Sequence, residues 1–299
     1  MRTRKAVITA AGRGTRMFPA TRAIQKEMLP LVDTDGLVKP TIQMIAEACV
    51  SAGIEELCIV VERGGGQAFQ EHFRAFTDDE KQVFAGKDWL LAEGEKLASL
   101  AERIRYVEQP SPEGFGHAVY QAKAFANGEP VLLLLGDHVY TGDPLGQMLA
   151  AGASSGGSVT GVRVEPESGV SVTGIIKGKA TETAGLYEIL ALQEKPTVAE
   201  VQALNTEGLA ASTYLGHFGI HLFTSEIFDC LGELIATNRR VKNEFQLTSG
   251  QELLWKRNPD NYRALLVAGE RWDIGLPDEY LRTLAKFGSL GPHSQVLMP

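Results

Sequence analysis

Short apolar runs alternate with amphipathic segments through the first half of the chain, and this alternation is the strongest constraint on the fold. Four runs have the length and composition of strands: Lys5–Ala11, Glu56–Glu62, Ile104–Gln109 and Val131–Asp137. The segments between them carry apolar residues at helical spacing: Thr41–Ile54, Gln67–Phe76, Trp89–Arg103 and His117–Ala126. The first, second and fourth runs are apolar enough to be buried on both faces of a sheet. The pattern therefore predicts an α/β fold with a doubly wound, mostly parallel sheet.

From about Gly157 the pattern of predicted elements changes, and strands follow one another with few helices between them. The predicted strands are Ser158–Val164, Gly174–Lys179, Tyr187–Gln193 and Thr213–Phe223, with a long loop around Pro196–Gly208. Helical spacing returns at Ser225–Thr237, Glu244–Arg257 and Pro277–Phe287, and Tyr262–Val267 reads as one more strand. We expect one catalytic unit over residues 1–299, with a β-rich lobe in its second half and a frayed tail at Gly288–Pro299.

The charge balance limits the partners of this protein. The chain has 29 basic and 37 acidic side chains among 299 residues, a formal net charge of −8. A protein that binds DNA, RNA or an anionic membrane needs a basic face to displace counterions, and no Lys/Arg run supplies one. No apolar stretch reaches the ~18 residues of a membrane span, and the N-terminal residues resemble neither a signal nor a transit peptide. We therefore expect a cytoplasmic protein that binds neither nucleic acid nor membranes.

A glycine-rich loop, Ala11–Arg16, directly follows the first predicted strand. Gly12 and Gly14 let the backbone approach a ligand, and successive free amide groups in such a loop form an anion-binding concavity. The loop is not a dinucleotide fingerprint, which needs glycine at Met17, and no Gly-Lys-Ser/Thr sequence makes it a Walker loop. Cations cluster around it in an otherwise acidic chain: Arg13, Arg16, Arg22 and Lys26. The segment is either a phosphate-binding loop or a solvated basic loop.

Two polar residues end predicted strands. Asp137 stands at the carboxyl end of a buried strand, where open α/β sheets bind their ligands. A carboxylate there suits Mg²⁺, which prefers one or two carboxylates together with phosphate oxygens, but it would also suit the cap of a following helix. Gln109 offers an amide donor and acceptor for a pyrimidine edge, and Gly114 at a helix start permits close approach of a flat base. Without such a ligand, Gln109 would be a surface residue.

Three segments near the N-terminus carry a family resemblance: Gly12-Arg13-Gly14-Thr15-Arg16, Pro19-Ala20-Thr21-Arg22-Ala23 and Lys26-Glu27-Met28-Leu29-Pro30-Leu31-Val32-Asp33. Together they resemble the signature of the sugar-1-phosphate nucleotidyltransferases, and most closely that of the bacterial uridylyltransferase branch. The resemblance spans roughly Lys5 to Gly288. It implies a Rossmann-like nucleotidyltransferase fold in which residues 1–150 bind the nucleotide and residues 151–299 add a sugar-phosphate-binding lobe and the C-terminal helices. It also implies that a nucleoside triphosphate is wrapped by Ala11, Gly12, Gly14, Arg16 and Lys26.

The same resemblance assigns residues to the base and the metal. Gln109-Pro110 and Gly114-Phe115-Gly116-His117-Ala118-Val119 resemble the uracil-binding segments of the family, which implicates Gln109, Gly114, Gly116 and His117. Asp137 matches the strand-end aspartate of the family. Trp272-Asp273-Ile274-Gly275 resembles its late Asp-x-Gly motif, so the resemblance implies Mg²⁺ on Asp137 and Asp273. The open alternative is that Asp273 caps the helix that follows.

The sugar side is implied by a third group of motifs. Gly174-Ile175-Ile176, Glu194-Lys195-Pro196 and Gly216-His217-Phe218-Gly219 resemble the sugar-phosphate lobe of these enzymes, which implicates Gly174, Glu194, Lys195 and Gly216. A carboxylate accepts hydrogen bonds from two hydroxyl groups, and a lysine neutralises a phosphate as a point charge. At a strand end before proline the two side chains diverge towards these groups. The alternative is a solvated Glu-Lys pair.

The chain departs from the family pattern at two points beside the glycine-rich loop. Gln25 stands where the family usually has proline. The residues Thr34–Val38 are inserted between Asp33 and the pair Lys39-Pro40, which usually follows the aspartate directly.

The resemblance implies Mg²⁺-dependent transfer of UMP from UTP to glucose 1-phosphate, with UDP-glucose and pyrophosphate as products. Such a step needs positioning and charge neutralisation more than a nucleophile, and no GxSxG elbow is present. Arg16, Lys26 and Lys195 are the expected catalytic cations. The alternatives are glucose-1-phosphate thymidylyltransferase or another hexose-1-phosphate nucleotidyltransferase and, in another class, a non-catalytic nucleotide-sugar sensor. The Gly-His-Ala-Val segment favours the uridylyltransferase. The sequence leaves the hexose open and allows a homo-oligomer.

Overall fold

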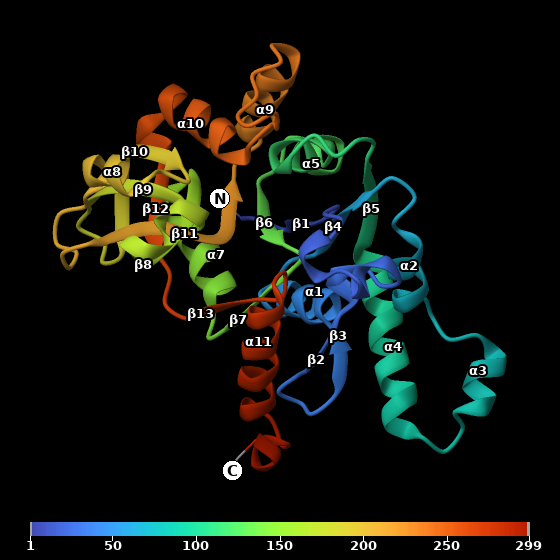
Figure 1. Cartoon of the computed structure of the whole chain (residues 1–299). Helices are drawn as coiled ribbons and strands as arrows, with labels where there is room; N and C mark the ends of the chain where they lie inside the picture. Colours follow the sequence, from blue (N-terminus) through green and yellow to red (C-terminus); the bar gives the residue numbers. More distant parts are fainter. Residues whose placement is uncertain (1, 298–299) are drawn as a thin grey trace.

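A nine-stranded sheet in the order β5-β4-β1-β6-β11-β8-β12-β10-β9 runs through this computed structural model, which describes residues 2–297 (Figure 1). One half of the sheet is parallel and consists of β1 (Lys5–Ala10), β4 (Glu56–Glu62), β5 (Ile104–Gln109) and β6 (Val131–Leu135). All four strands lie where the sequence predicts them. Because they are parallel, their carboxyl ends share one edge of the sheet.

Helices cover both faces of the parallel half. They are α1 (Thr41–Ser51), α2 (Gln67–Phe73), α4 (Asp88–Arg103), α5 (Phe115–Gln121) and α6 (Lys123–Ala126). Ala6 and Ile8 of β1 belong to one core cluster with Ile42 of α1, whereas Val7 belongs to a second cluster with Val119 of α5. Successive side chains of a strand point to opposite faces, so one apolar strand supplies both cores. The doubly wound sheet predicted from the sequence is confirmed.

The second half of the sheet forms the β-rich lobe. Its strands are β8 (Ser158–Pro166), β9 (Gly174–Ala180), β10 (Leu186–Glu194), β11 (Thr213–Phe223) and β12 (Tyr262–Leu266). The pairing closes into a ring, because β9 pairs with both β10 and β11. β11 changes partner along its length: Leu215 and Gly216 pair with β9, and Ile220–Phe223 pair with β6. Gly219, with φ of 94°, lies between these stretches, where the register with β8 shifts.

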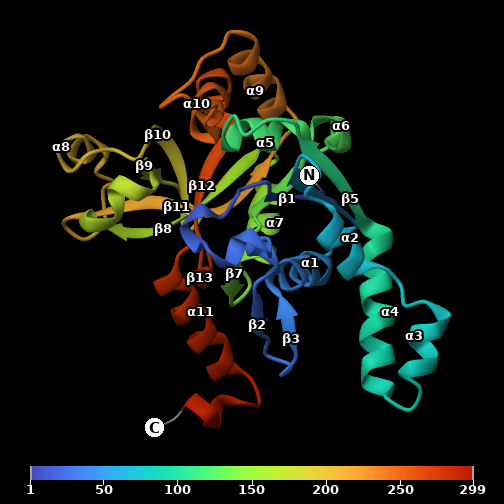
Figure 2. The same cartoon turned by 45° about the vertical axis from the view of Figure 1, so that its right-hand side comes forward.

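The remaining helices complete the fold. They are α3 (Asp78–Val83), α7 (Pro144–Ser155), α8 (Val198–Val201), α9 (Glu226–Ala236), α10 (Leu247–Arg257) and α11 (Pro277–Leu290). In both views α3 and α4 extend away from the sheet on the side remote from the β-rich lobe (Figures 1 and 2). Of these helices, α3, α7 and α8 were not predicted; α8 lies in the segment expected to be a loop. Among residues 2–297, no helix has both the length and the apolar content needed to cross a membrane.

Two pairs of short strands lie outside the main sheet, and neither pair was predicted. β2 (Pro30–Val32) pairs with β3 (Val38–Pro40), and β7 (His138–Thr141) pairs with β13 (Glu270–Asp273). Strands of three or four residues are too short to show a periodic pattern.

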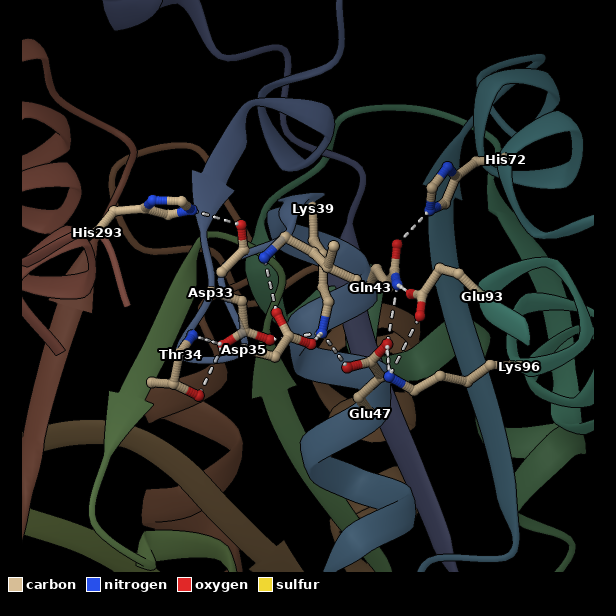
Figure 3. A network of polar contacts seen from close by, with 12 residues as sticks. Asp33, Thr34, Asp35, Lys39, Gln43, Glu47, His72, Glu93, Lys96 and His293 are labelled. Atoms are coloured by element: carbon tan, nitrogen blue, oxygen red, sulfur yellow. Dashed lines mark hydrogen bonds and ion pairs between the residues drawn. The ribbon is translucent and has the colours of Figure 1, made fainter. Parts of the chain in front are cut away.

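The inserted residues Thr34–Val38 form the turn and the start of the second strand of the β2–β3 hairpin, and Lys39 follows in β3. The Lys39 ammonium lies 2.7 Å from Asp33, 2.5 Å from Asp35 and 2.9 Å from Glu47 of α1 (Figure 3). Lys96 of α4 contacts Glu47 at 3.1 Å, which extends the network to a second helix. The insertion is therefore accommodated as an ion-paired hairpin.

The tail does not fray over the residues that are described. α11 continues to Leu290, and a 3₁₀ helix covers Ser294–Leu297. His293 hydrogen-bonds to the Gly36 carbonyl at 3.2 Å, which attaches the tail to the β2–β3 hairpin (Figure 3). The expectation of fraying was therefore wrong for these residues. The sequence pattern could not reveal the contact, because it joins residues 257 apart in the chain. Met298 and Pro299 lie outside the described residues.

Candidate active site

The carboxyl ends of three parallel strands bring the first group of candidate residues together. Gly12 follows β1, Gln109 ends β5, and Asp137 follows β6. They line a cavity of about 280 Å³. Other lining residues include Ala11, Arg13, Lys26, Gly114, Phe115, Leu135 and Glu244. This is the edge at which open α/β sheets bind ligands.

A second, larger cavity of about 650 Å³ lies between this edge and the β-rich lobe. The predicted residues on its wall are Arg16, Asp137, Gly174, Glu194, Lys195 and Asp273. Phe115, Leu135, Asp137 and Glu244 line both cavities. The two cavities therefore meet at Asp137, and a ligand in one can contact a ligand in the other there.

Asp137 and Asp273 are brought together by the short β7–β13 pair. His138 is opposite Asp273 in this pair, and the Ile274 amide donates to the Asp137 carbonyl at 3.0 Å. A Cβ atom on Gly275 would lie 3.1 Å from Asp137 Oδ2 and 3.0 Å from Asp273 Oδ1. The two carboxylates thus converge on one small space that only glycine leaves open.

The helix-cap alternatives for the two aspartates are wrong. The segment after Asp137 is a strand, β7. α11 begins at Pro277 with Leu276 as its N-cap and no side-chain cap, and Asp273 Oδ1 instead accepts from the Gly275 amide at 2.5 Å. Both carboxylates are therefore free of a capping role.

Charges around Asp137 stabilise one another. The Lys26 ammonium is ion-paired with Asp137 and lies 3.6 Å from the carboxylate of Glu27. Burial alone would lower the pKa of Lys26, but these two carboxylates raise it. Burial likewise works against ionisation of Asp137, but His138 and Lys26 lower its pKa. Glu27 is fully buried with no hydrogen-bond partner for its carboxylate among the described residues, and burial raises its pKa to about 8.

Asp273 stays ionised despite its burial. Burial raises the pKa of Asp273, but a hydrogen bond and charge from His138 and the Gly275 amide hold it well below the usual range. The His138 Nε2 atom lies 3.4 Å from Asp273 and 3.9 Å from Asp137. The site therefore presents two carboxylates beside a cationic loop.

The glycine-rich loop folds on itself through Gly14, which is not on either cavity wall. Gly14 has φ of 59° and precedes a 3₁₀ helix at Thr15–Met17. Its carbonyl accepts from the Thr21 hydroxyl at 2.9 Å, and a Cβ atom there would lie 2.8 Å from Thr21 Cγ2. Gln25, which replaces the usual proline, donates to the Gly65 carbonyl at 2.7 Å. The first contact holds the loop to the segment that follows it, and the second holds that segment to the residues after β4.

Gln109 is buried and oriented for a ligand. Its Nε2 donates to the Gly114 carbonyl at 3.1 Å and contacts His117 Nδ1 at 3.1 Å. His117 is buried and does not line the cavity, so its place in the site is behind Gln109. The Oε1 atom of Gln109 has no hydrogen bond from the described residues, which leaves an acceptor beside the cavity.

Gly114 and Gly116 lie directly against another segment of the chain. A Cβ atom on either would lie 2.8 to 2.9 Å from the backbone of Phe245 or Gln246. The Gly116 amide donates to the Phe245 carbonyl at 2.8 Å. The close approach that these glycines permit is therefore made by the chain before α10. Gly114 also lines the smaller cavity, whereas Gly116 does not.

The Glu194-Lys195 pair is partly solvated, since the Lys195 side chain is 43% exposed and the Glu194 side chain 23%. Glu194 accepts from the Thr248 hydroxyl at 2.5 Å and lies 3.3 Å from the Lys195 ammonium. Lys195 has φ of 45°, an uncommon conformation for a residue with a side chain, and it lines the larger cavity. Gly174 allows Glu194 and His217 to approach, because a Cβ atom there would lie 3.2 and 2.7 Å from them.

Gly216 lies off the cavity wall, where it packs against Glu165. Several cavity residues were not predicted from the sequence: Phe115, Arg163, Glu244, Thr248 and Arg271. Two of these residues could have been found from the sequence. Arg163 is a lone arginine in an apolar predicted strand, and Arg271 lies two residues before Asp273. Glu244 and Thr248 lie near the start of a helix and show no pattern that separates them from surface residues.

Comparisons with known proteins agree over nearly the whole chain. A family model described as nucleotidyl transferase matches residues 5–288. A UTP–glucose-1-phosphate uridylyltransferase of Staphylococcus epidermidis is 35% identical over 296 residues, which cover 97% of this chain and 93% of the relative. A structure of UDP-glucose pyrophosphorylase complexed with UDP-glucose matches with a TM-score of 0.77 and 27% identity, covering 95% of this chain and 98% of the other. A UTP-bound UGPase from Acinetobacter baumannii matches with a TM-score of 0.80 and 26% identity, covering 98% and 97%.

Proposed function

Because the chain belongs to the nucleotidyl transferase family, we propose that it transfers UMP from UTP to glucose 1-phosphate. A phosphate oxygen of glucose 1-phosphate bonds to the α-phosphorus of UTP, the bond to the β-phosphate oxygen breaks, and pyrophosphate leaves with the electron pair. The single observation that carries the proposal is that two cavities meet at Asp137. That arrangement suits in-line attack between two separately bound phosphates.

The smaller cavity, formed by residues 1–150 together with Glu244, would hold UTP. Gln109 Oε1 is free to accept the N3–H of uracil, because its Nε2 is already occupied. The backbone at Ala11 and Gly12 would follow the triphosphate. Arg16 and Lys26 would stabilise the charge that develops on the leaving pyrophosphate. Thymine carries the same N3–H group, so UTP and dTTP are compared in the test.

The larger cavity would hold the hexose 1-phosphate. Glu194 would accept from sugar hydroxyl groups, and its bond from Thr248 fixes the carboxylate in place. Lys195, which lines this cavity, would neutralise the attacking phosphate. Gly174 lets the Glu194 carboxylate approach its backbone and would thereby set the position of Glu194 beside the sugar.

Asp137 and Asp273 would hold Mg²⁺. Their oxygens converge on the space over Gly275. Two carboxylates, with phosphate oxygens and water as further ligands, match the preference of this hard cation. When bound, Mg²⁺ supplies charge neutralisation at the phosphates. Lys26 would leave Asp137 for the triphosphate.

The proposal is tested by turnover of the purified chain with UTP, glucose 1-phosphate and Mg²⁺, measured as pyrophosphate release and as UDP-glucose. We expect dTTP and galactose 1-phosphate to react more slowly. Asp137→Asn should lose activity, whereas Asp260→Asn, at an exposed carboxylate remote from both cavities, should not. Faster reaction with dTTP would indicate a thymidylyltransferase. Binding of UDP-glucose without any turnover would indicate a sensor.

A further inference from the structure

Two guanidinium groups, those of Arg163 and Arg271, share the larger cavity with Lys195. Arg163 comes from β8, where it is opposite Gly216 of β11. Arg271 comes from β13, where it is opposite Tyr140 of β7. Neither element is close to the other in sequence, so the fold alone places these cations on one wall.

Arg163 is held in a fixed orientation. Its Nε and Nη2 atoms both lie 2.7 Å from Glu165 Oε2, and Glu165 is buried. This arrangement leaves Nη1 without a hydrogen-bond acceptor among the described residues. The guanidinium group of Arg163 is therefore held in place, but one of its nitrogen atoms has no hydrogen-bond acceptor among the described residues.

The side chain of Arg271 has even fewer of its hydrogen-bond donors paired. Its Nε atom is buried and has no hydrogen-bond partner among residues 2–297. The one hydrogen bond from its side chain runs from Nη1 to the His217 carbonyl at 3.5 Å. An arginine carries five N–H donors, and buried donors are normally paired.

The charges point to a missing anion. Arg271 forms no ion pair with a carboxylate within residues 2–297, whereas Arg163 is paired with Glu165. Two like charges in one partly buried cavity repel each other, and Glu165 is in ion-pair contact with only one of them, Arg163. A phosphate, with several acceptor oxygens, matches donors that converge from two strands.

Strand geometry locates the anion relative to the metal carboxylates. Arg271 and Asp273 are two residues apart on β13, so their side chains share one face of that strand. A phosphate bound by Arg271 would thus lie on the side of the strand that faces Asp137 and the nucleotide cavity.

We propose that Arg163 and Arg271, together with Lys195, bind the phosphate group of the incoming hexose 1-phosphate. This inference rests on the function proposed above and adds two binding residues to it. Lys195 neutralises the phosphate from the end of β10, while the two guanidinium groups fix its orientation by directed hydrogen bonds. The phosphate remains in the product as the β-phosphate of UDP-glucose, so the same residues bind the product.

The test compares UDP-glucose with UMP, which lacks the β-phosphate and sugar, by calorimetric titration of the full chain. We expect Arg163→Met and Arg271→Met each to raise the Kd of UDP-glucose by about 10- to 100-fold, the range for hydrogen bonds to a charged group. The Kd of UMP should change by less than about 2-fold, because these residues do not line the nucleotide cavity. Arg271→Lys should recover part of the affinity. Arg263→Met, in the same lobe but off the cavity, is the matched control.

Two results would overturn the inference: unchanged UDP-glucose affinity in both variants, or an equal loss of UMP and UDP-glucose affinity, which would indicate a structural role. Arg163→Met provides the measurement if Arg271→Met does not fold, since its side chain is 34% exposed. Turnover by the wild-type chain is measured in parallel. If the wild-type chain makes UDP-glucose but both variants bind UDP-glucose with unchanged affinity, only the proposed phosphate-binding role of the two arginines is refuted. A chain that binds UDP-glucose through these arginines but makes none refutes only the proposed function.

Discussion

The ammonium group of Lys26 is ion-paired with the carboxylate of Asp137, which lies 111 residues further along the chain. This pair joins the segment that follows the glycine-rich loop to the carboxyl end of β6. The same carboxylate converges with Asp273 on the space over Gly275. A divalent cation and the Lys26 ammonium would therefore compete for Asp137.

This competition predicts that Lys26→Met strengthens metal binding to the nucleotide-free protein. Removing the ammonium leaves Asp137 unpaired, so we expect the Kd of Mn²⁺ to fall by roughly 10-fold, equivalent to about 1.4 kcal/mol. Electron paramagnetic resonance of free Mn²⁺ measures this without turnover. Lys96→Met, on α4 and outside both cavities, is the control. Unchanged Mn²⁺ affinity would show that Lys26 does not shield the carboxylate.

Lys195→Ala and Asp137→Ala should each slow turnover by ~10²-fold or more at saturating substrates, because each removes a preorganised electrostatic group. The measurement is kcat for pyrophosphate release, with thermal unfolding to confirm that the variants fold. Lys179→Ala, which removes an exposed lysine of β9, controls for loss of a cation in the same lobe. Near-wild-type kcat in both site variants would refute the assigned roles.

Gly275→Ala should reduce turnover by at least about 10-fold with little loss of stability, the pattern of a misplaced catalytic geometry. The added methyl group would occupy the space 3.0 to 3.1 Å from the two carboxylates. Gly66→Ala is the control, since its Cβ would meet its nearest neighbour at 3.5 Å, an ordinary contact. An active Gly275→Ala enzyme would mean that the cation binds elsewhere.

Gly116→Ala should destabilise the fold, whereas Gly12→Ala should not. A Cβ atom on Gly116 would lie 2.9 Å from the Gln246 backbone, but one on Gly12 would lie 3.5 Å from the flexible Lys26 side chain. We expect a loss of about 1 to 3 kcal/mol for Gly116→Ala, the usual cost of overpacking. Urea denaturation measures both. Equal stabilities would show that the segment before α10 yields without cost.

His221 should make stability depend on pH. It is buried beside Thr160, whose hydroxyl lies 2.6 Å from the His221 Nδ1 atom, and burial lowers the pKa of His221 well below 6.5. The unfolded chain then binds one more proton than the folded chain below pH 6.5, so stability is lost as pH falls.

Stability is lost mainly over the roughly 1.5 pH units between pH 6.5 and pH 5. At about 1.4 kcal/mol per pH unit, the free energy of unfolding falls by about 2 kcal/mol. The free energy of unfolding of His221→Gln should therefore approach that of the wild type, or pass it, on acidification. Chemical denaturation at several pH values gives both curves. A constant difference between them would show that His221 titrates equally in both states.

The alternating pattern of apolar runs by itself determined the parallel half of the sheet. β1, β4 and β6 are buried on both faces, so their sequences are apolar at nearly every position, and the helices between them show the period of an amphipathic face. The strand-end position of Asp137 followed from the same pattern. The family signature around Gly12 and Lys26 located the loop that lies beside it.

Tertiary structure alone decided which residues complete the site. Asp273 reaches Asp137 through the β7–β13 pair of four-residue strands, whose pairing depends on residues 129 apart such as Thr141 and Glu270. Gly116 is glycine because a distant backbone segment packs against it, and Arg163 and Arg271 meet in one cavity although they lie on different strands. Local periodicity reflects which side of an element is buried, but it carries no information on which distant segment buries it.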